Sequence, residues 1–305
     1  MSGYLAIGFR SNKVGDKADV THPQPPSETA VMALKALADF WADMGLEEAR
    51  TLNIPRTAPQ RPTAGTRPTA PVRQAEAPAR PSVPGARPEP KRLNNNPIAE
   101  ARRLAGAAST LAELRTTIQQ FDGCPLKKAA KNTVVCDGAF DADIMIVGEA
   151  PGGEEDAQGL PFVGRAGKLL DKMLASIGLS RQENVYITNL IYWRPPGNRD
   201  PSPAEMQICA PFLSRQIELK RPKLLLTAGK FATQAMLGTE DGIMRLRGRK
   251  MLYRQEGLAT PVKCVPMLHP AYLLRRPEDK AKAWDDLRTI AALCDEMGIK
   301  RGPSL

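Results

Sequence analysis

Short apolar runs alternate with amphipathic segments through the C-terminal two thirds of the chain. Four of these runs are flanked by polar or glycine-containing turns, as buried strands are; they are Ile144–Gly148, Val185–Trp193, Leu224–Ala228 and Val262–Leu268. Apolar positions at helical spacing predict helices at residues 97–120, 164–178, 203–219, 230–237 and 278–296. Strands that alternate with helices pair in parallel. The pattern therefore predicts an α/β fold, with a four-stranded parallel sheet flanked by helices on both faces.

Two segments of different character precede this region. Residues 28–50 have apolar positions every three or four residues, which predicts one amphipathic helix within an N-terminal segment, 1–50. Residues 51–95 hold ten of the 28 prolines, together with Ala and Arg, which is typical of a flexible linker. We therefore expect a separate folded domain at 96–305. The helix at 28–50 either docks on that domain or binds a protein partner, and the sequence favours neither reading.

Composition narrows the class of protein. The net charge of +10 and the pI near 9.5 favour a polyanionic partner, although residues 51–92 alone supply +6 of that charge. No apolar run is long enough to span a membrane, and the N-terminus lacks the apolar core of a secretory signal. Five irregularly spaced cysteines are typical of reduced thiols. We expect a cytoplasmic protein that makes no membrane contact.

The most informative loop follows the first predicted strand. It reads GEAPGGEED from Gly148, and it crowds Glu149, Glu155 and Asp156 around three glycines. It then leads through Phe162 into a helix. Open α/β folds bind ligands at the carboxyl ends of their strands, where this loop must lie. A bland turn needs fewer acids, so the loop predicts a functional site.

Three other loops follow predicted strands and carry polar side chains. They begin at Asn189 with the run Arg194–Arg199, at Gly229-Lys230, and at His269 with the run Pro270–Arg276. His269 is one of only two histidines, and the other, His22, lies in the N-terminal segment. A lone histidine is more often structural than catalytic, but its place at a strand end beside these loops favours a functional role.

These residues resemble the uracil-DNA glycosylase superfamily, and most of all its family-four members. The resemblance covers residues 121–296 and rests on five motifs in order, namely GEAPGGEED, LPFVGRAGKLLD, VYITN, RPPGNRDP and HPAYLLR. It implies a four-stranded parallel sheet between helices, which agrees with the pattern above. It also implies an enzyme that flips uracil out of DNA, hydrolyses its N-glycosidic bond and leaves an abasic site.

The resemblance implies roles for individual residues. Phe162 is expected to stack on the flipped base, and Asn189 to read its edge through an amide that both donates and accepts. His269 is expected to donate to uracil O2 and stabilise the departing anion. Ala150 and Gly152 are expected to bind the base. One of the acids Glu149, Glu155 and Asp156 would hold the attacking water or favour the sugar cation, and the sequence does not separate them.

The same resemblance predicts contacts with DNA. Leu273 lies where the family inserts a wedge into the base stack, with Tyr272 and Leu274 beside it. The phosphate-binding candidates are Asn198, Arg245, Arg247, Arg275 and Arg276. The expected partner is DNA that contains uracil or an abasic site, bound by a monomer.

The chain departs from the family-four pattern at its cysteines. Members of that family hold an iron–sulfur cluster with four cysteines, but Phe121 and Trp193 occupy two of those positions here, and only Cys124 and Cys209 remain. A cluster needs four thiolates, so we expect no cluster, no other cofactor and no metal, with both aromatic side chains filling the space as packing. A rearranged site would have to use Cys136. Cys264, inside a predicted strand, is more simply a buried thiol.

A second departure concerns a superfamily branch that captures the sugar on a histidine. The corresponding stretch, Met244–Lys250, is basic but has no histidine, which favours turnover. A competing hypothesis is a non-catalytic protein that binds DNA lesions or abasic sites. The carboxylates and His269 disfavour it, and the predicted wedge disfavours a hydrolase of free nucleotides.

Overall fold

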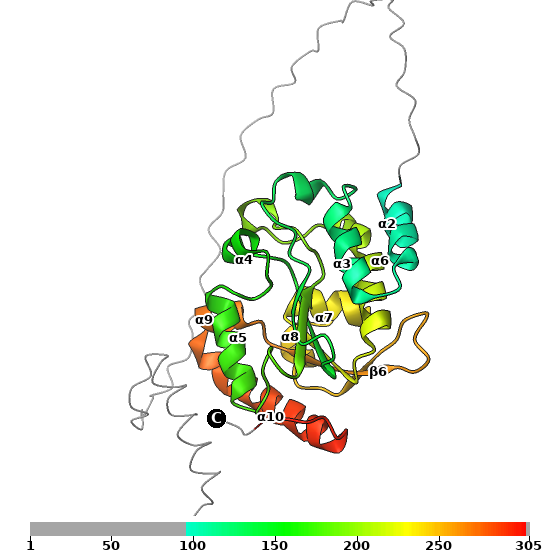
Figure 1. Ribbon diagram of the computed structural model, residues 1–305. Coiled ribbons are helices and arrows are strands. Elements are labelled where there is room, and N and C mark those ends of the chain that lie inside the picture. The colour runs from blue at the N-terminus through cyan, green and yellow to red at the C-terminus, as the bar shows by residue number, and fades with distance from the viewer. Residues whose placement is uncertain (1–95, 303–305) are drawn as a thin grey trace, which may run out of the picture.

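The computed structural model describes residues 96–302, which form a helix-covered β-sheet (Figure 1). Six strands pair in the order β1-β3-β2-β4-β6-β5. Their bounds are β1 (Cys136–Gly138), β2 (Ile144–Gly148), β3 (Val185–Asn189), β4 (Leu224–Ala228), β5 (Met251–Tyr253) and β6 (Val262–Met267). The four central strands, β3, β2, β4 and β6, run parallel, while β1 and β5 pair antiparallel at the two edges.

The four predicted strands are thus confirmed, but the sheet is mixed rather than purely parallel. β3 also ends at Asn189, four residues before the end of the predicted run. The two edge strands are three residues long, too short for an apolar period to be recognised in the sequence. The predicted helix 28–50 and linker 51–95 lie outside the described residues.

Nine α-helices and three 3₁₀ turns precede, connect or follow the strands within residues 96–302. The α-helices are α2 (Pro97–Ala107), α3 (Leu111–Gln120), α4 (Gly153–Gln158), α5 (Arg165–Ala175), α6 (Pro203–Lys220), α7 (Lys230–Leu237), α8 (Ile243–Leu246), α9 (Pro270–Arg275) and α10 (Lys280–Glu296). The 3₁₀ turns are η1 (Pro125–Lys128), η2 (Pro196–Asn198) and η3 (Pro277–Asp279). Within this region, no helix is both long and apolar enough to cross a bilayer.

The predicted helix 97–120 is in fact two helices. Thr110 adopts an extended backbone conformation, and its side chain accepts a hydrogen bond from the backbone N–H of Glu113 at 3.1 Å. The Glu113 carboxylate in turn accepts from the backbone N–H of Ser109 at 2.8 Å. This pairing caps a new helix start, so the chain turns between α2 and α3 despite the continuous apolar period.

The sheet separates two apolar layers, because successive strand side chains point to opposite faces. Ile144 and Ile146 of β2 belong to the layer under α5 and α10, whereas Met145 and Val147 belong to the layer under α2, α3 and α6. Figure 1 shows α5, α9 and α10 grouped together, apart from α2, α3 and α6. The predicted helices on both faces are therefore confirmed.

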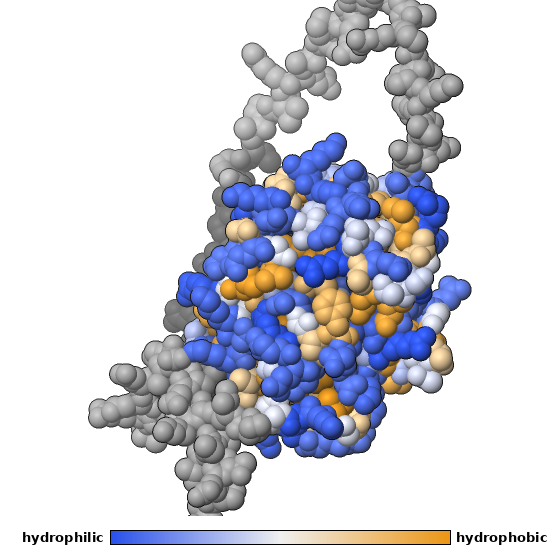
Figure 2. Space-filling model, viewed as in Figure 1, coloured by the Kyte–Doolittle hydropathy of each residue, from blue (hydrophilic) through white to orange (hydrophobic). Residues whose placement is uncertain are grey.

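This arrangement brings four strand ends to one edge of the sheet. The parallel strands β2, β3, β4 and β6 all end there, and each is followed by a loop or helix start that carries polar residues. On the molecular face in Figure 2, hydrophilic residues predominate and apolar residues are confined to patches between them. Binding sites of open α/β sheets lie at this edge.

Candidate active site

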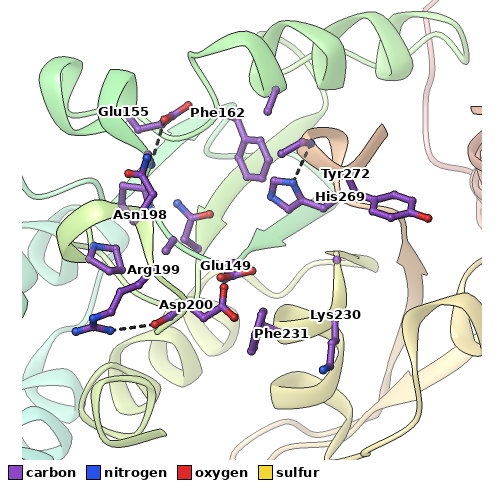
Figure 3. A pocket seen from close by; sticks show the side chains of 18 of the residues that line it. Glu149, Glu155, Phe162, Asn198, Arg199, Asp200, Lys230, Phe231, His269 and Tyr272 are labelled. Atoms are coloured by element: carbon purple, nitrogen blue, oxygen red, sulfur yellow. Dashed lines mark hydrogen bonds between the residues drawn. The ribbon is translucent and has the colours of Figure 1, made fainter. Parts of the chain in front are cut away.

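A cavity of about 500 Å³ opens at the carboxyl edge of the sheet (Figure 3). It is lined by Glu149, Ala150, Pro151, Gly152, Glu155, Phe162, Ala166, Asn189, Pro195, Asn198, Arg199, Asp200, Gly229, Lys230, Phe231, Ile243, Leu268, His269, Ala271, Tyr272 and Arg275. The structure thus brings the four loops selected from the sequence together around one space. The cavity is large enough to hold a small planar ligand.

The aromatic wall of the cavity is held in a demanding backbone conformation. Phe162 has φ of 53°, in the left-handed region that is rare for a bulky residue. The buried Arg181 guanidinium donates to the carbonyls of Pro161 and Phe162, at 3.1 and 2.6 Å. Gly167 packs so closely that a Cβ there would lie 1.8 Å from the Phe162 carbonyl oxygen. These contacts fix the ring, which stacks on the His269 ring at 5.5 Å between centroids.

Asn189 ends β3 with its side chain in the same space. It is only 2% exposed, and its Oδ1 has no hydrogen-bond partner within residues 96–302. An unpaired buried acceptor costs about 1–3 kcal/mol, so this atom is positioned for a ligand donor. Gly148 makes the room, because a Cβ there would lie 2.3 Å from Asn189 Oδ1 and 2.6 Å from the Phe162 ring.

His269 is held in one tautomer at the start of α9. Its Nδ1 accepts a hydrogen bond from the backbone N–H of Ala271 at 3.0 Å. In a neutral imidazole the proton must then sit on Nε2, which makes that atom a donor. Burial, and then the positive charge of Arg275, lower the pKa of His269 to about 4. At neutral pH the ring is therefore an uncharged, oriented donor.

The three predicted acids have different surroundings. Glu149 lies half-buried in the cavity wall, and no hydrogen bond to its carboxylate occurs among the described residues. Burial, and then the nearby charge of Asp200, raise its pKa to about 7. A carboxylate with that pKa is suited to take a proton near neutral pH.

Glu155 also lines the cavity, but its carboxylate is already committed. It accepts hydrogen bonds from the backbone N–H groups of Gly152, Val163 and Gly164, at 3.1, 3.1 and 2.9 Å. These bonds join the two ends of the 152–164 segment. Glu155 therefore shapes the loop that presents Phe162.

The prediction that Asp156 is catalytic is corrected by the structure. Asp156 is 4% exposed, does not line the cavity, and accepts hydrogen bonds from the backbone N–H groups of Lys131 and Asn132. On α4 it points away from Glu155 because successive helical residues are about 100° apart. Its role is to hold the 131–132 turn.

Two DNA-binding predictions are also corrected. Leu273 is 1% exposed and packs in the layer that contains α5 and α10, so it cannot insert into DNA without leaving the core. The side chain that protrudes from α9 is Leu274, at 37% exposure. Arg247 binds the buried Asp286 through two contacts of 3.0 and 2.8 Å, so its guanidinium is not free for a phosphate.

The other predicted DNA-binding residues surround the cavity or lie on the surface. Tyr272 and Arg275 line the cavity, and the Tyr272 hydroxyl hydrogen-bonds to Asp279. Asn198 lines it too, and its Oδ1 accepts from Arg194 Nε at 2.7 Å. Arg245 and Arg276 are largely exposed, with surface pairs of 3.3 Å to Asp241 and Glu278. Such pairs are weak and leave both arginines available to phosphates.

The positions expected to hold cluster ligands form an aromatic packing site instead. The Phe121 ring lies 5.0 Å from Phe212 and 6.4 Å from Trp193, between centroids. Trp193 is fully buried, and its Nε1–H donates to Thr133 Oγ1 at 3.0 Å. The prediction that Phe121 and Trp193 serve as apolar packing is confirmed.

The thiols at these positions do not fit an iron–sulfur cluster. Cys124 and Cys209 are buried and hydrogen-bond to each other, which leaves two of the four thiolates that a cluster needs. Within residues 96–302, no group of three or more His, Cys, Asp and Glu side chains is arranged to hold a metal ion. The predicted burial of Cys264 in β6 is confirmed.

Sequence reasoning missed three residues that shape the site. Asp200 and Phe231 line the cavity. Each lies directly beside a residue that was singled out, and Asp200 belongs to the RPPGNRDP motif, so both could have been found by extending the motifs. Arg181 has no such signal, because its partners, including Asp137 at 2.7 Å, are far away in the sequence.

Comparisons with known proteins agree with this geometry. The profile of the Uracil DNA glycosylase superfamily matches residues 136–288, which include the whole cavity wall. The chain is 44% identical over 200 residues to a type-4 uracil-DNA glycosylase of Archaeoglobus fulgidus, covering 64% of this chain and 97% of that protein. A type-4 uracil-DNA glycosylase of Saccharolobus solfataricus is 40% identical over 178 residues, which cover 57% of this chain and 81% of that protein. One of Thermotoga maritima is 39% identical over 166 residues, which cover 54% of this chain and 83% of that protein.

Proposed function

Because the chain belongs to the uracil-DNA glycosylase superfamily, we propose that it is a DNA-repair enzyme that flips uracil out of DNA and hydrolyses its N-glycosidic bond. The observation that carries this proposal is the unpaired, buried Oδ1 of Asn189 next to a fixed aromatic ring. A uracil that stacks on Phe162 offers an N3–H donor to that oxygen.

Base recognition in this proposal combines shape and hydrogen bonds. Stacking of a base on an aromatic ring contributes about 1–3 kcal/mol. The amide of Asn189 accepts from uracil N3–H and donates to O4, and the acceptor that is unpaired in the free protein gains its partner. Cytosine presents an unprotonated N3 and an amino group at these positions, so it would leave both hydrogen bonds unmade.

His269 stabilises the leaving group. When the C1′–N1 bond breaks, the electron pair stays on uracil, and negative charge develops at O2. The single Nε2–H of the neutral ring can donate to that oxygen, and the Ala271 N–H holds the ring in the required tautomer. Because the pKa is about 4, the ring need not lose a proton before it acts. A donor placed at a developing anion is an oxyanion-type contribution.

We assign to Glu149 the role of accepting a proton from the attacking water. It is the carboxylate of the three predicted acids that lies in the cavity without a hydrogen-bond partner among the described residues. The attacking water forms a bond to C1′ and gives one proton to the Glu149 carboxylate. The raised pKa of about 7 supports this role.

We also propose that no iron–sulfur cluster takes part in folding or catalysis. The proposal is supported by the contact between the Phe121 and Trp193 rings and by the Cys124–Cys209 hydrogen bond. No step above uses such a group. Metal analysis of the purified full chain tests it, and stoichiometric iron would contradict it.

The unit that carries out this reaction is proposed to be a monomeric domain at 96–305. Every residue of the cavity wall lies between Glu149 and Arg275, which supports this boundary. The proposed partner is DNA that contains uracil or an abasic site. The side chains proposed to face this DNA are Leu274, Arg245, Arg275 and Arg276. Protein binding by the helix predicted at 28–50 stays one of two hypotheses for that segment, and the enzyme is proposed to work in the cytoplasm.

A uracil-containing oligonucleotide tests the function directly. The full chain should produce alkali-labile sites at uracil and none at cytosine. His269→Ala should lower the single-turnover rate by about 10²–10³, the usual effect of removing an oxyanion donor, with little change in DNA binding. His22→Ala is the matched control, because it removes the other histidine, which belongs to the N-terminal segment 1–50. Tight binding without excision by the unaltered protein would instead support a non-catalytic lesion binder.

A further inference from the structure

A second carboxylate faces Glu149 across the cavity. Asp200 lies in the connection between η2 and α6, and both residues line the cavity. In Figure 3 the side chains of Glu149 and Asp200 point toward one another, below the rings of Phe162 and His269. The sequence alone did not predict Asp200 as a residue of the site.

The connection that carries Asp200 is held firmly, but not through the Asp200 carboxylate. Arg199 binds Glu205 through contacts of 2.9 and 2.6 Å and donates to the backbone carbonyl of Asp200 at 3.0 Å. Glu205 also accepts from the backbone N–H of Ser202 at 2.8 Å, in a capping box at the start of α6. The Asp200 side chain has no hydrogen bond to another described residue. These contacts fix the backbone at Asp200, while its exposed side chain keeps an unpaired charge.

The cations of the cavity wall do not neutralise this pair of acids. Arg199 is engaged by Glu205, and the Lys230 ammonium lies over the neighbouring Phe231 ring at 5.6 Å from its centroid. The charge of Arg275 lowers the pKa of His269, and that ring is uncharged at neutral pH. The remaining acid, Glu155, is bound by three backbone N–H groups. Burial opposes the ionisation of Glu149 most, and Asp200 is the charged group that adds to this effect.

We propose that Asp200 is a positioning residue of the hydrolytic step, whose charge faces Glu149 and helps to keep that carboxylate basic enough to take the proton of the attacking water. The inference rests on the proposed function. The water forms its bond to C1′ as the bond to uracil N1 breaks, and the proton passes to Glu149 and not to Asp200. A carboxylate that faces a second negative charge holds a proton more tightly than an isolated one, so Glu149 becomes a better proton acceptor.

This role has a physical alternative, namely that Asp200 only stabilises its loop. The anchoring contacts of that loop use Arg199, Glu205 and Ser202 instead of the Asp200 carboxylate. A neutral amide of the same shape should therefore leave the fold intact and change only the field at Glu149. The pH profile of excision separates the two roles, because a structural role would lower the rate at every pH without moving the midpoint.

The test compares single-turnover excision by full-length Asp200→Asn and wild-type protein from pH 5 to 9. We expect the rising limb to move to lower pH and the plateau rate to fall about threefold to tenfold, since a weaker base is a poorer proton acceptor. Asp200→Glu keeps the charge and should keep the wild-type midpoint. Asp122→Asn is the matched control, because its side chain is 88% exposed and lies outside the cavity.

The outcomes distinguish this inference from the proposed function. An Asp200→Asn midpoint equal to that of the wild type would overturn the inference while excision itself stood. The same conclusion follows if Asp200→Glu, tested as a folded protein, loses the wild-type midpoint. Absence of uracil excision by the wild-type protein would instead refute the proposed function. If Asp200→Asn does not fold, the anchoring argument is wrong and the inference fails with it.

Discussion

Gly148→Ala adds a single methyl group next to Asn189 and the Phe162 ring, which together form the proposed recognition slot for the base. The backbone at Gly148 lies in strand β2, which alanine adopts without strain. The new Cβ would lie 2.3 Å from Asn189 Oδ1 and 2.6 Å from two carbons of the Phe162 ring. Since ordinary contacts of this kind are about 3.5–4 Å, these neighbours must shift by about 1 Å.

Neither neighbour can move freely. Asn189 and Phe162 are buried, and Arg181 holds the Phe162 backbone carbonyl at 2.6 Å. Overpacking of this kind costs about 1–3 kcal/mol of stability. A displacement of about 1 Å at a positioning residue can lower a rate by about 10²-fold. We therefore expect Gly148→Ala to remain folded with a lowered Tm, and to excise uracil about 100-fold more slowly than the wild type.

Single-turnover excision and thermal unfolding measure the two effects separately. Gly106→Ala is the matched control, because Gly106 lies within α2 and a Cβ there would meet no atom within 4 Å. It should stabilise the protein by about 0.5–1 kcal/mol and leave excision unchanged. Wild-type rate and stability in Gly148→Ala would refute the view that Asn189 and Phe162 form a rigid slot.

Three further predictions concern the site and its support. Excision should rise with pH through about 7, because Glu149 must lose its proton to act. The contribution of Glu149 to stability has the opposite pH dependence: it is present below the usual pKa of 4.5 and is lost as the pH rises through 7. A Glu149→Gln variant that kept the same rising limb of excision would refute this assignment. Arg181→Met should cost about 2–4 kcal/mol in denaturant unfolding, less than a fully buried pair because one partner, Asp171, is nearly half exposed. Gln216→Leu should cost about 1–3 kcal/mol, because it leaves the buried Tyr192 hydroxyl unpaired, whereas the Tyr186 hydroxyl keeps its hydrogen bond with Cys136; wild-type stability would contradict the buried network.

The central strands were predictable for a simple reason. Strands buried on both faces are continuous apolar runs, so the bounds of β2 and β4 agree with the sequence to the residue. The edge strand β5 has no such run. It is three residues long, and its Leu252 is among the exposed large apolar side chains. The mixed character of the sheet therefore could not be read from periodicity.

The sequence predicted which types of residue line the cavity, but not always which groups of the protein those residues contact. His269 and Asn189 follow strands, and the fold places them at one edge. An acid or an arginine in a promising loop has no visible partner in the sequence, and Asp156 and Arg247 proved to be bound by groups within the protein itself. Leu273 was misjudged because one residue along a helix changes the side that a side chain faces.

The aromatic packing site and the cavity at the carboxyl edge of the sheet are linked through one short segment. Trp193 is anchored in the core by its ring contacts and by the hydrogen bond to Thr133. The chain then continues through Pro195 to Asn198, which is held by Arg194, and on to Asp200 at the cavity. Trp193 thus anchors the start of this segment, and the contacts between Arg199 and Glu205 anchor its end next to Asp200. In this chain, packed aromatic side chains thus hold one end of the loop that presents a charge to the proposed base.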